Sequence, residues 1–110
     1  MNGTAGWVRV RTRPHSVLLE LGGEVDAVME GELERAVTEA RSRDLPVEVD
    51  TRAVTFMDSL ALASLARLTA GQRATTFVDP PDLVRFLLEV TRLGEVIAIR
   101  ESGDGARSAT

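Results

Sequence analysis

The sequence contains no cysteine and no lysine, and it has a single histidine. Without cysteine, disulfide frameworks and thiolate metal sites are excluded. All 13 basic residues are arginines, so chemistry that requires a lysine is excluded too, including nucleotide binding by a P-loop. One histidine and the lack of a Gly-x-Ser-x-Gly motif leave no catalytic triad, and the residues therefore do not indicate an enzyme.

Long apolar runs are also missing. No stretch approaches the roughly 20 apolar residues that a membrane span needs, and residues 1–6 do not resemble a signal peptide. The net charge of −4 disfavours a nucleic-acid partner. With 110 residues, of which 44% are hydrophobic, we expect one cytoplasmic domain over residues 1–110. Residues 1–6 and 102–110 are expected to be flexible tails.

The hydrophobic pattern predicts strands that alternate with helices. Strands are predicted over residues 7–13, 16–21, 47–50, 74–78 and 95–99, with 54–57 extended or in a loop, and helices over residues 28–43, 59–72 and 82–93. The turn at Pro14 and His15 favours an antiparallel hairpin with an exposed histidine. Gly22 and Gly23 are expected to end the second strand, with positive φ. The alternation predicts an α/β domain with a mixed, mostly parallel sheet of four or five strands.

Apolar residues at strand and helix spacing form the predicted core. They are Val17, Leu19, Leu21, Leu33, Val37, Val47, Val49, Leu62, Leu65, Phe77, Leu83, Phe86, Leu87, Val90, Val96 and Ile99. In the helix over 59–72, the core face also includes Ala66 and Thr69, and it leaves Leu60, Ala61, Ser64, Arg67 and Leu68 outside. A helix that is apolar beyond one stripe is either fully buried or covers a partner. Full burial is difficult in so small a domain, so we favour a partner surface and expect Leu60 and Leu68 to be exposed.

Three aspartates, Asp26, Asp50 and Asp58, are expected in loops where helices begin. Ligand sites of open α/β sheets lie at the carboxyl ends of the parallel strands. Three carboxylates at that edge would be compatible with a magnesium site, which is one interpretation of these residues. Aspartates also commonly cap helices. Ser59 either caps the second helix, or Asp58 caps it and leaves Ser59 as the first helical residue. A phosphate on Ser59 would meet the positive end of the helix dipole.

Three segments match the motifs of one known family. Residues 21–26 (LGGEVD) resemble its Gly-Glu-aliphatic-Asp motif after the second strand. Residues 47–59 (VEVDTRAVTFMDS) are similar to the strand and loop that lead to its acceptor serine, and residues 81–94 (PDLVRFLLEVTRLG) are similar to its final helix. In order and spacing, these segments resemble the STAS domain of anti-sigma factor antagonists and sulfate transporters, over residues 8–101.

The resemblance implies a sheet with helices packed mainly on one side and no cofactor. It implies a monomer or weak dimer that binds a serine-kinase anti-sigma factor, with Ser59 as the phosphate acceptor whose modification breaks the complex. The predicted partner-binding residues are Gly23, Glu24, Asp26, Asp58, Ser59, Leu60, Ala61, Ser64, Arg67 and Leu68. After the serine the family usually has a small residue and then glycine, whereas Leu60 and Ala61 stand here. The alternative is a non-phosphorylated STAS adaptor or scaffold subunit of a transport ATPase or a signalling complex.

Overall fold

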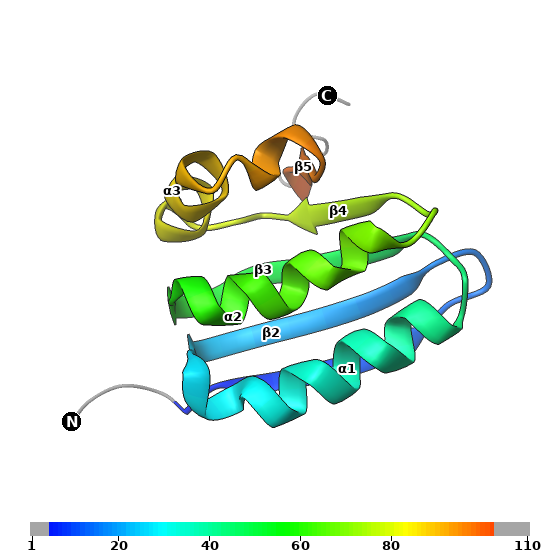
Figure 1. Cartoon of the computed structure of the whole chain (residues 1–110), viewed down its shortest axis with the longest axis horizontal. Helices are drawn as coiled ribbons and strands as arrows, with labels where there is room; N and C mark the ends of the chain where they lie inside the picture. Colours follow the sequence, from blue (N-terminus) through cyan, green and yellow to red (C-terminus); the bar gives the residue numbers. More distant parts are fainter. Residues whose placement is uncertain (1–4, 103–110) are drawn as a thin grey trace.

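A five-stranded sheet forms the centre of the computed structural model, which describes residues 5–102. The strands lie side by side in chain order (Figure 1). They are β1 (Trp7–Thr12), β2 (Val17–Val25), β3 (Val47–Met57), β4 (Thr75–Val78) and β5 (Ala98–Arg100). Only the β1–β2 pair is antiparallel, and the other three pairs are parallel. The predicted mixed, mostly parallel α/β sheet is therefore confirmed.

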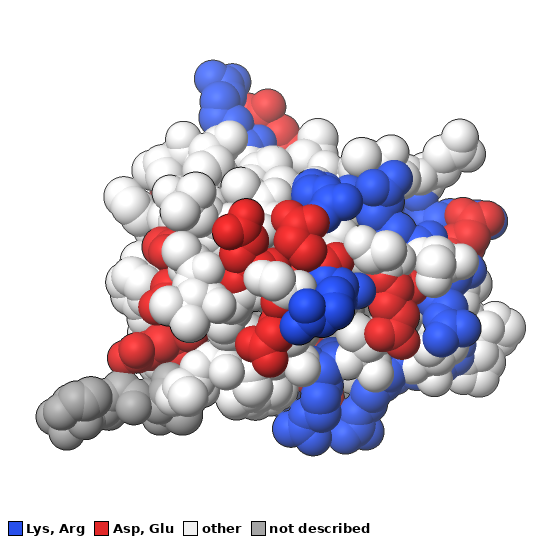
Figure 2. Space-filling model, turned by 60° about the horizontal axis from the view of Figure 1, so that its bottom comes forward, with Lys and Arg blue, Asp and Glu red and all other residues white. Residues whose placement is uncertain are grey.

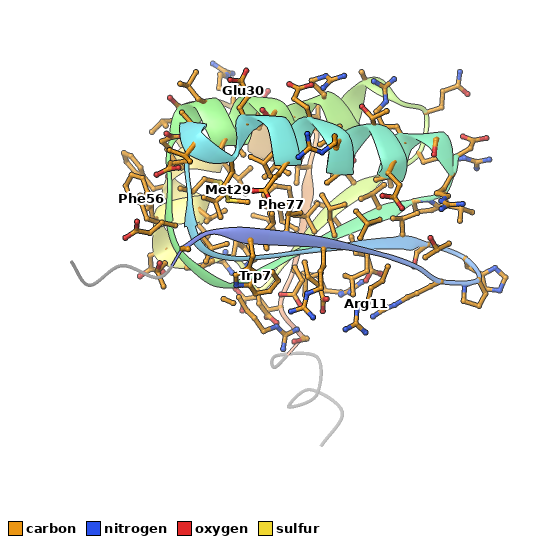
Figure 3. The ribbon with its side chains drawn as sticks, turned by 90° about the horizontal axis from the view of Figure 1, so that it is seen from below. Trp7, Arg11, Met29, Glu30, Phe56 and Phe77 are labelled. Carbon is orange, nitrogen blue, oxygen red and sulfur yellow. The ribbon has the colours of Figure 1, made fainter. Side chains whose placement is uncertain are left out.

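Each connection between two parallel strands contains a helical segment. These segments are η1 (Ala27–Met29) with α1 (Glu30–Ser42), α2 (Ser59–Ala66) with η2 (Arg67–Ala70), and α3 (Asp82–Val90) with η3 (Leu93–Glu95), where η marks a 3-10 helix. In Figure 3, α1 and α2 cover one face of the sheet, while Trp7 and Arg11 project from the other face. Within residues 5–102, no helix is long and apolar enough to cross a membrane.

The core lies between the sheet and the helices. All ten core residues predicted before residue 80 are buried, because alternate strand residues and one stripe of each helix face the same layer. Phe77 at the centre of β4 is fully buried, and it lies between sheet and helices together with Met29 (Figure 3). Sequence periodicity therefore predicts the central core correctly.

The predicted core face of α3 is wrong. Val84 and Leu88 face the core, Leu87 is half-buried, and Leu83, Phe86 and Val90 are exposed. The cause is that α3 carries apolar residues on two opposite sides, and helical spacing alone does not choose between them.

Two apolar residues beyond α3, Val96 and Ile99, were also predicted to be buried. Both are exposed, whereas Ile97 is buried. The chain turns through η3 before β5 begins at Ala98, so the side of the sheet that each residue faces differs from the prediction.

Several predicted boundaries also need correction. Gly22 and Gly23 do not end β2: the strand continues to Val25, although Gly23 has the expected positive φ of 71° and lies at a shift in register. Residues 54–57 belong to β3 rather than to a loop. The α-helical part of the second helix ends at Ala66, and α3 ends at Val90 because Arg92 adopts a left-handed φ of 64°.

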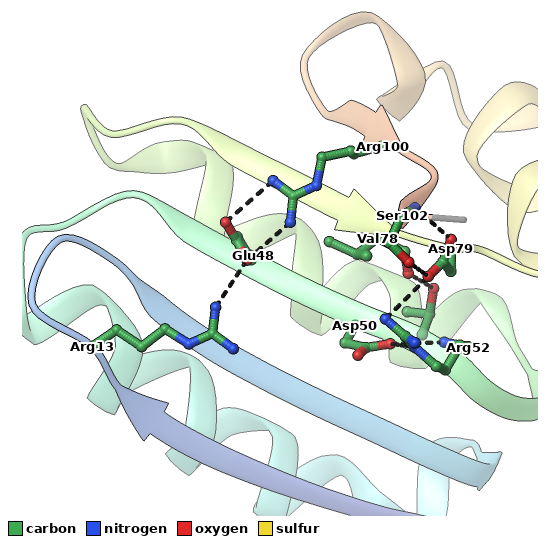
Figure 4. A network of polar contacts seen from close by, with 9 residues as sticks. Arg13, Glu48, Asp50, Arg52, Val78, Asp79, Arg100 and Ser102 are labelled. Atoms are coloured by element: carbon green, nitrogen blue, oxygen red, sulfur yellow. Dashed lines mark hydrogen bonds and ion pairs between the residues drawn. The ribbon is translucent and has the colours of Figure 1, made fainter. Parts of the chain in front are cut away.

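Arginines and carboxylates cover the helix-free face of the sheet (Figure 4). Glu48 of β3 pairs with Arg100 of β5 at 3.1 Å and with Arg13 at 3.6 Å. Asp50 also lies on this face and pairs with Arg52 at 3.1 Å, so it is a strand residue and not the predicted loop residue. These charged side chains cover Leu18 and Val78, which are buried on the helix-free face of the sheet.

Asp79 anchors the end of the described chain to the sheet. Its carboxylate accepts hydrogen bonds from the Ser102 hydroxyl at 2.6 Å and the Ser102 amide at 2.9 Å, and it pairs with Arg52 at 3.1 Å. The Ser102 hydroxyl, with support from Arg52, holds the pKa of Asp79 below its ordinary value of 3.8. The predicted tails fall mostly outside the described residues, but Ser102 is held in place.

Candidate functional site

One carboxylate joins two helical segments at the end of the sheet where β2 and β3 finish. Asp58 precedes α2, and its Oδ1 accepts a hydrogen bond from the Ala61 amide at 2.8 Å. Its Oδ2 accepts one from the Ala27 amide of η1 at 3.2 Å. Asp58 therefore caps α2 and Ser59 is the first helical residue, which settles the two alternatives left by the sequence.

Ser59 is exposed at this helix N-terminus. Because Asp58 already accepts from Ala61, the serine hydroxyl is not needed as a cap. A phosphate on Ser59 would lie near the positive end of α2 but also next to the Asp58 carboxylate. The site thus combines a reachable hydroxyl with an acidic neighbour.

Asp26 plays a similar role one segment earlier. Its Oδ1 accepts from the Val28 amide at 3.1 Å and caps η1. This turn holds Val28 almost completely in solvent, at 92% exposure, while Met29 is buried below it. Leu60 follows Ser59 and is 64% exposed, as predicted. Two apolar side chains therefore project beside the serine.

A groove of about 250 Å³ separates the first turns of α1 and α2. It is lined by Asp26, Ala27, Glu30, Glu34, Leu60, Ala61, Ala63, Ser64 and Arg67. Small residues of α2, Ala61 and Ser64, form its buried floor. The groove is large enough to receive a partner's side chain, and its walls carry three carboxylates.

The helix-covered face of the molecule carries many acidic side chains near the end where α1 and α2 begin. Figure 2 shows acidic side chains at the left and centre of the face it presents, while the right half carries arginines interspersed with further acidic side chains. Of the residues from 5 to 102, Arg67 is the only basic one that lines the groove, and it is paired with Glu34 across the two helices. The groove therefore presents a net negative surface beside Ser59.

Most of the predicted partner-binding residues meet at this end of the molecule. Glu24, Ser59 and Leu60 are exposed, Asp26 and Asp58 cap the helical segments, and Ala61, Ser64 and Arg67 line the groove. Gly23 is buried within β2.

The prediction for Leu68 is wrong. Leu68 is 3% exposed and belongs to the core. The predicted core face of this helix was displaced around the helix axis. Ala61, Ser64 and Leu68, which were predicted to lie outside the core, are buried at normal helical spacing with Leu62 and Leu65. Ala66 and Thr69, which were predicted on the core face, are only half-buried. The interface expected from Leu60 and Leu68 together is therefore reduced to Leu60.

Sequence reasoning missed the residues that α1 and η1 contribute. Glu30 and Glu34 line the groove, and the exposed Val28 belongs to η1, which the Ala27 amide ties to Asp58. Nothing in the sequence pairs α1 with α2 across the groove. The spacing of Glu30 and Glu34, four residues apart and off the apolar face of α1, was the available signal. Among residues 5–102 no group of three or more side chains is arranged to hold a metal ion, so the magnesium site left open by the sequence has no geometric support there.

The comparisons with known proteins agree with this architecture. A family model described as "Mlab, STAS domain" matches residues 8–100. The chain belongs to the STAS domain family. No curated protein sequence matches it significantly.

Solved structures share the fold of this STAS domain. An anti-sigma factor antagonist from Mycobacterium paratuberculosis matches with a TM-score of 0.80 and 22% identity, over 96% of this chain and 93% of that one. The anti-sigma factor antagonist SpoIIAA in its unphosphorylated form gives 0.64 and 18%, over 94% and 96%. The phosphorylated form of the Bacillus cell fate determinant SpoIIAA gives 0.64 and 16%, over 94% and 100%. At these identities the similarity establishes the fold.

Proposed function

We propose that this STAS domain is an anti-sigma factor antagonist that binds a serine-kinase anti-sigma factor with the surface around Ser59. Phosphorylation of Ser59 switches this binding off. The observation that carries the proposal is the exposed Ser59 hydroxyl at the first position of α2, with the helix cap supplied by Asp58 instead. The serine is therefore free to react without loss of the cap.

The chemistry of the switch is a phosphoryl transfer in which the partner supplies ATP and the catalytic base. The Ser59 oxygen attacks the γ-phosphorus, the bond to ADP breaks, and the hydroxyl proton passes to the base of the kinase. The product carries about −1.5 to −2 additional charges at neutral pH. The positive end of α2 tolerates this charge, so the fold survives.

The phosphate weakens the complex through its size and its strong hydration, because it falls where the Ser59 hydroxyl packs against the partner. Asp26, Asp58 and Glu30 surround the serine end, and a partner that fits them must be basic there and must pack against Leu60. A phosphate in this interface adds bulk and must be desolvated. A loss of about 1.4 kcal/mol already lowers the affinity tenfold.

The test uses serine-kinase anti-sigma factors from the source organism with purified wild-type chain and ATP. Mass spectrometry should locate one phosphate on Ser59, and affinity for the kinase should fall at least tenfold after modification. Ser59→Ala should bind without being modified, and Ser59→Asp should fold and bind poorly. Ser42→Ala is the matched control, since Ser42 is bonded to the Glu39 carbonyl at the far end of α1 and should behave as wild type.

A second candidate is the static adaptor, and the exposed Leu60 favours it. An apolar side chain directly after the serine suits a permanent interface better than one that must release. If wild type, Ser59→Ala and Ser59→Asp bind their partner equally and no phosphate is found on Ser59, the adaptor replaces the switch. Leu60→Asp should weaken binding in both cases, because the leucine packs against the partner either way.

A further inference from the structure

The outer side of α3 carries an apolar stripe that the fold leaves uncovered. Leu83, Phe86 and Val90 follow one another at spacings of three and four residues and are 37%, 56% and 57% exposed. Val84 and Leu88, on the opposite side of the same helix, hold it to the core. The stripe is therefore not required to anchor α3, and large apolar side chains grouped on one exposed face mark a contact surface.

The stripe has an acidic edge. Asp82 and Glu89 are exposed, and with Phe86 they form the neighbouring row of the helix surface, at spacings of four and three residues. Among residues 5–102 neither carboxylate has an ion-pair partner. Arg85 points elsewhere: its Nε donates to the Pro80 carbonyl at 3.2 Å, and its guanidinium pairs with Glu101.

We propose that this face of α3 docks a basic amphipathic helix of a protein partner. The apolar stripe supplies anchors at the spacing that a helix presents to another helix, and the acidic row requires lysines or arginines beside the partner's apolar residues. A second copy of this chain fits poorly, because an antiparallel two-fold pair would place the two acidic rows on the same side. An anionic membrane surface fits poorly for the same electrostatic reason.

This surface is separate from the groove beside Ser59. The groove lies between α1 and α2, whereas α3 lies on the other side of α2, towards β4 and β5 (Figure 1). No residue lines both surfaces. Docking at α3 is therefore independent of the phosphorylation state of Ser59, and it holds whether the chain is a switch or an adaptor.

The test uses a synthetic helical peptide of leucine, alanine and lysine, about five turns long, whose lysines flank one leucine stripe, and a second peptide with glutamate in place of every lysine. Amide chemical shifts of the isotope-labelled chain report where each peptide binds. The basic peptide should shift residues 82–90, the acidic one should not, and salt should weaken binding several-fold because the screening length shortens. Phe86→Ser and Val90→Ser should each weaken binding at least tenfold.

Two control variants test separately whether the acidic edge of α3 and the surface beside Ser59 contribute to peptide binding. Asp82→Asn with Glu89→Gln should weaken binding of the basic peptide about fivefold without any change in the apolar stripe. Leu60→Ser should leave binding within twofold, since Leu60 lies on the groove. Circular dichroism checks that each variant folds, which is expected because the altered side chains are exposed.

Three results would overturn the proposal. The first is equal binding of the two peptides, or shifts outside α3 only. The second is a dimer in sedimentation whose formation shifts the same α3 amides, which would assign the face to a second copy. The third is binding of anionic phosphatidylglycerol vesicles that Phe86→Ser abolishes, which would assign the face to a membrane.

Discussion

The indole of Trp7 occupies the space above Gly22 in which any other residue would place its Cβ. A Cβ on Gly22 would come within 2.3 Å of Trp7 Cζ2, far inside van der Waals contact. The two residues are register partners of β1 and β2, and the guanidinium of Arg9 lies 4.8 Å from the ring centroid. Glycine inside this strand is therefore a packing requirement of the neighbouring tryptophan.

Gly22→Ala should force the indole away from the sheet. The variant should lose about 1–3 kcal/mol of unfolding free energy, the usual cost of overpacking. Because Trp7 is the only tryptophan, its fluorescence should also shift to the red as the ring moves into water. Urea unfolding followed by fluorescence and by circular dichroism measures both effects.

Gly31→Ala is the matched control for that experiment. Gly31 lies in α1, and an added Cβ would meet only the Arg35 guanidinium at 3.6 Å. Alanine at this second position of α1 should stabilise the chain by at most about 0.5–1 kcal/mol, the value for a helix interior, and leave the fluorescence unchanged. A fluorescence spectrum of Gly22→Ala that matches wild type would show that the indole does not depend on the glycine.

The sequence predicted what depends on regular spacing. Alternation along β2 and β3, and the apolar stripe of α1, point to one shared core, and these residues are buried as expected. The alternation of strands with helices along the chain predicted a mostly parallel sheet. The position of Ser59 at a helix start also follows from local sequence, because Asp58 can act as a cap.

The errors occur where a short element has two acceptable orientations. In α3 both Val84 and Phe86 belong to apolar stripes, and only tertiary contacts decide which stripe is buried. Leu68 was misplaced because the second helix is apolar on more than one face, and spacing alone does not choose between the stripe with Thr69 and the stripe with Leu68. The groove beside Ser59 could not be predicted either, since it depends on how α1 packs against α2.

The Ser102 hydrogen bonds and the Arg52 ion pair of Asp79 predict a specific response to acid. The pKa of Asp79 is lowered in the folded chain, so the stabilisation is present above pH 3.8, the ordinary value, and is lost as the pH falls through the folded pKa. Asp79→Asn removes this response. Asparagine tolerates the left-handed φ of 51° and can still accept from Ser102, so the change isolates the charge. The urea midpoint of wild type should therefore fall more steeply below pH 4 than that of the variant.

Two further variants identify which contact lowers the pKa of Asp79. Ser102→Ala removes the hydroxyl donor, which is the largest cause, and should flatten the acid response nearly as much as Asp79→Asn. Arg52→Gln should flatten it less, because the arginine contributes a smaller part. Identical acid profiles for wild type and Asp79→Asn would contradict the assignment.

The two bonds of Asp58 can be separated by substitution. Asp58→Ala removes the cap of α2 and the bond to the Ala27 amide together, and it should cost about 1–2 kcal/mol of unfolding free energy. Asp58→Asn offers only one acceptor oxygen. Its amide oxygen can keep the shorter bond to Ala61, but its NH₂ then faces the Ala27 amide, so donor meets donor. The asparagine variant should lose part of the stability that the alanine variant loses.

Hydrogen exchange distinguishes the two bonds directly, since it reports each amide separately. In Asp58→Asn the Ala27 amide should exchange faster while Ala61 stays protected, and in Asp58→Ala both should exchange faster. Asp26→Asn is the matched control: within the described residues 5–102 the Asp26 carboxylate accepts only from the Val28 amide, and an asparagine oxygen can replace it without loss. If Ala27 remains protected in Asp58→Asn, then the link from α2 to η1 does not run through this carboxylate. The exposed Val28 would in that case be held by the Asp26 turn alone.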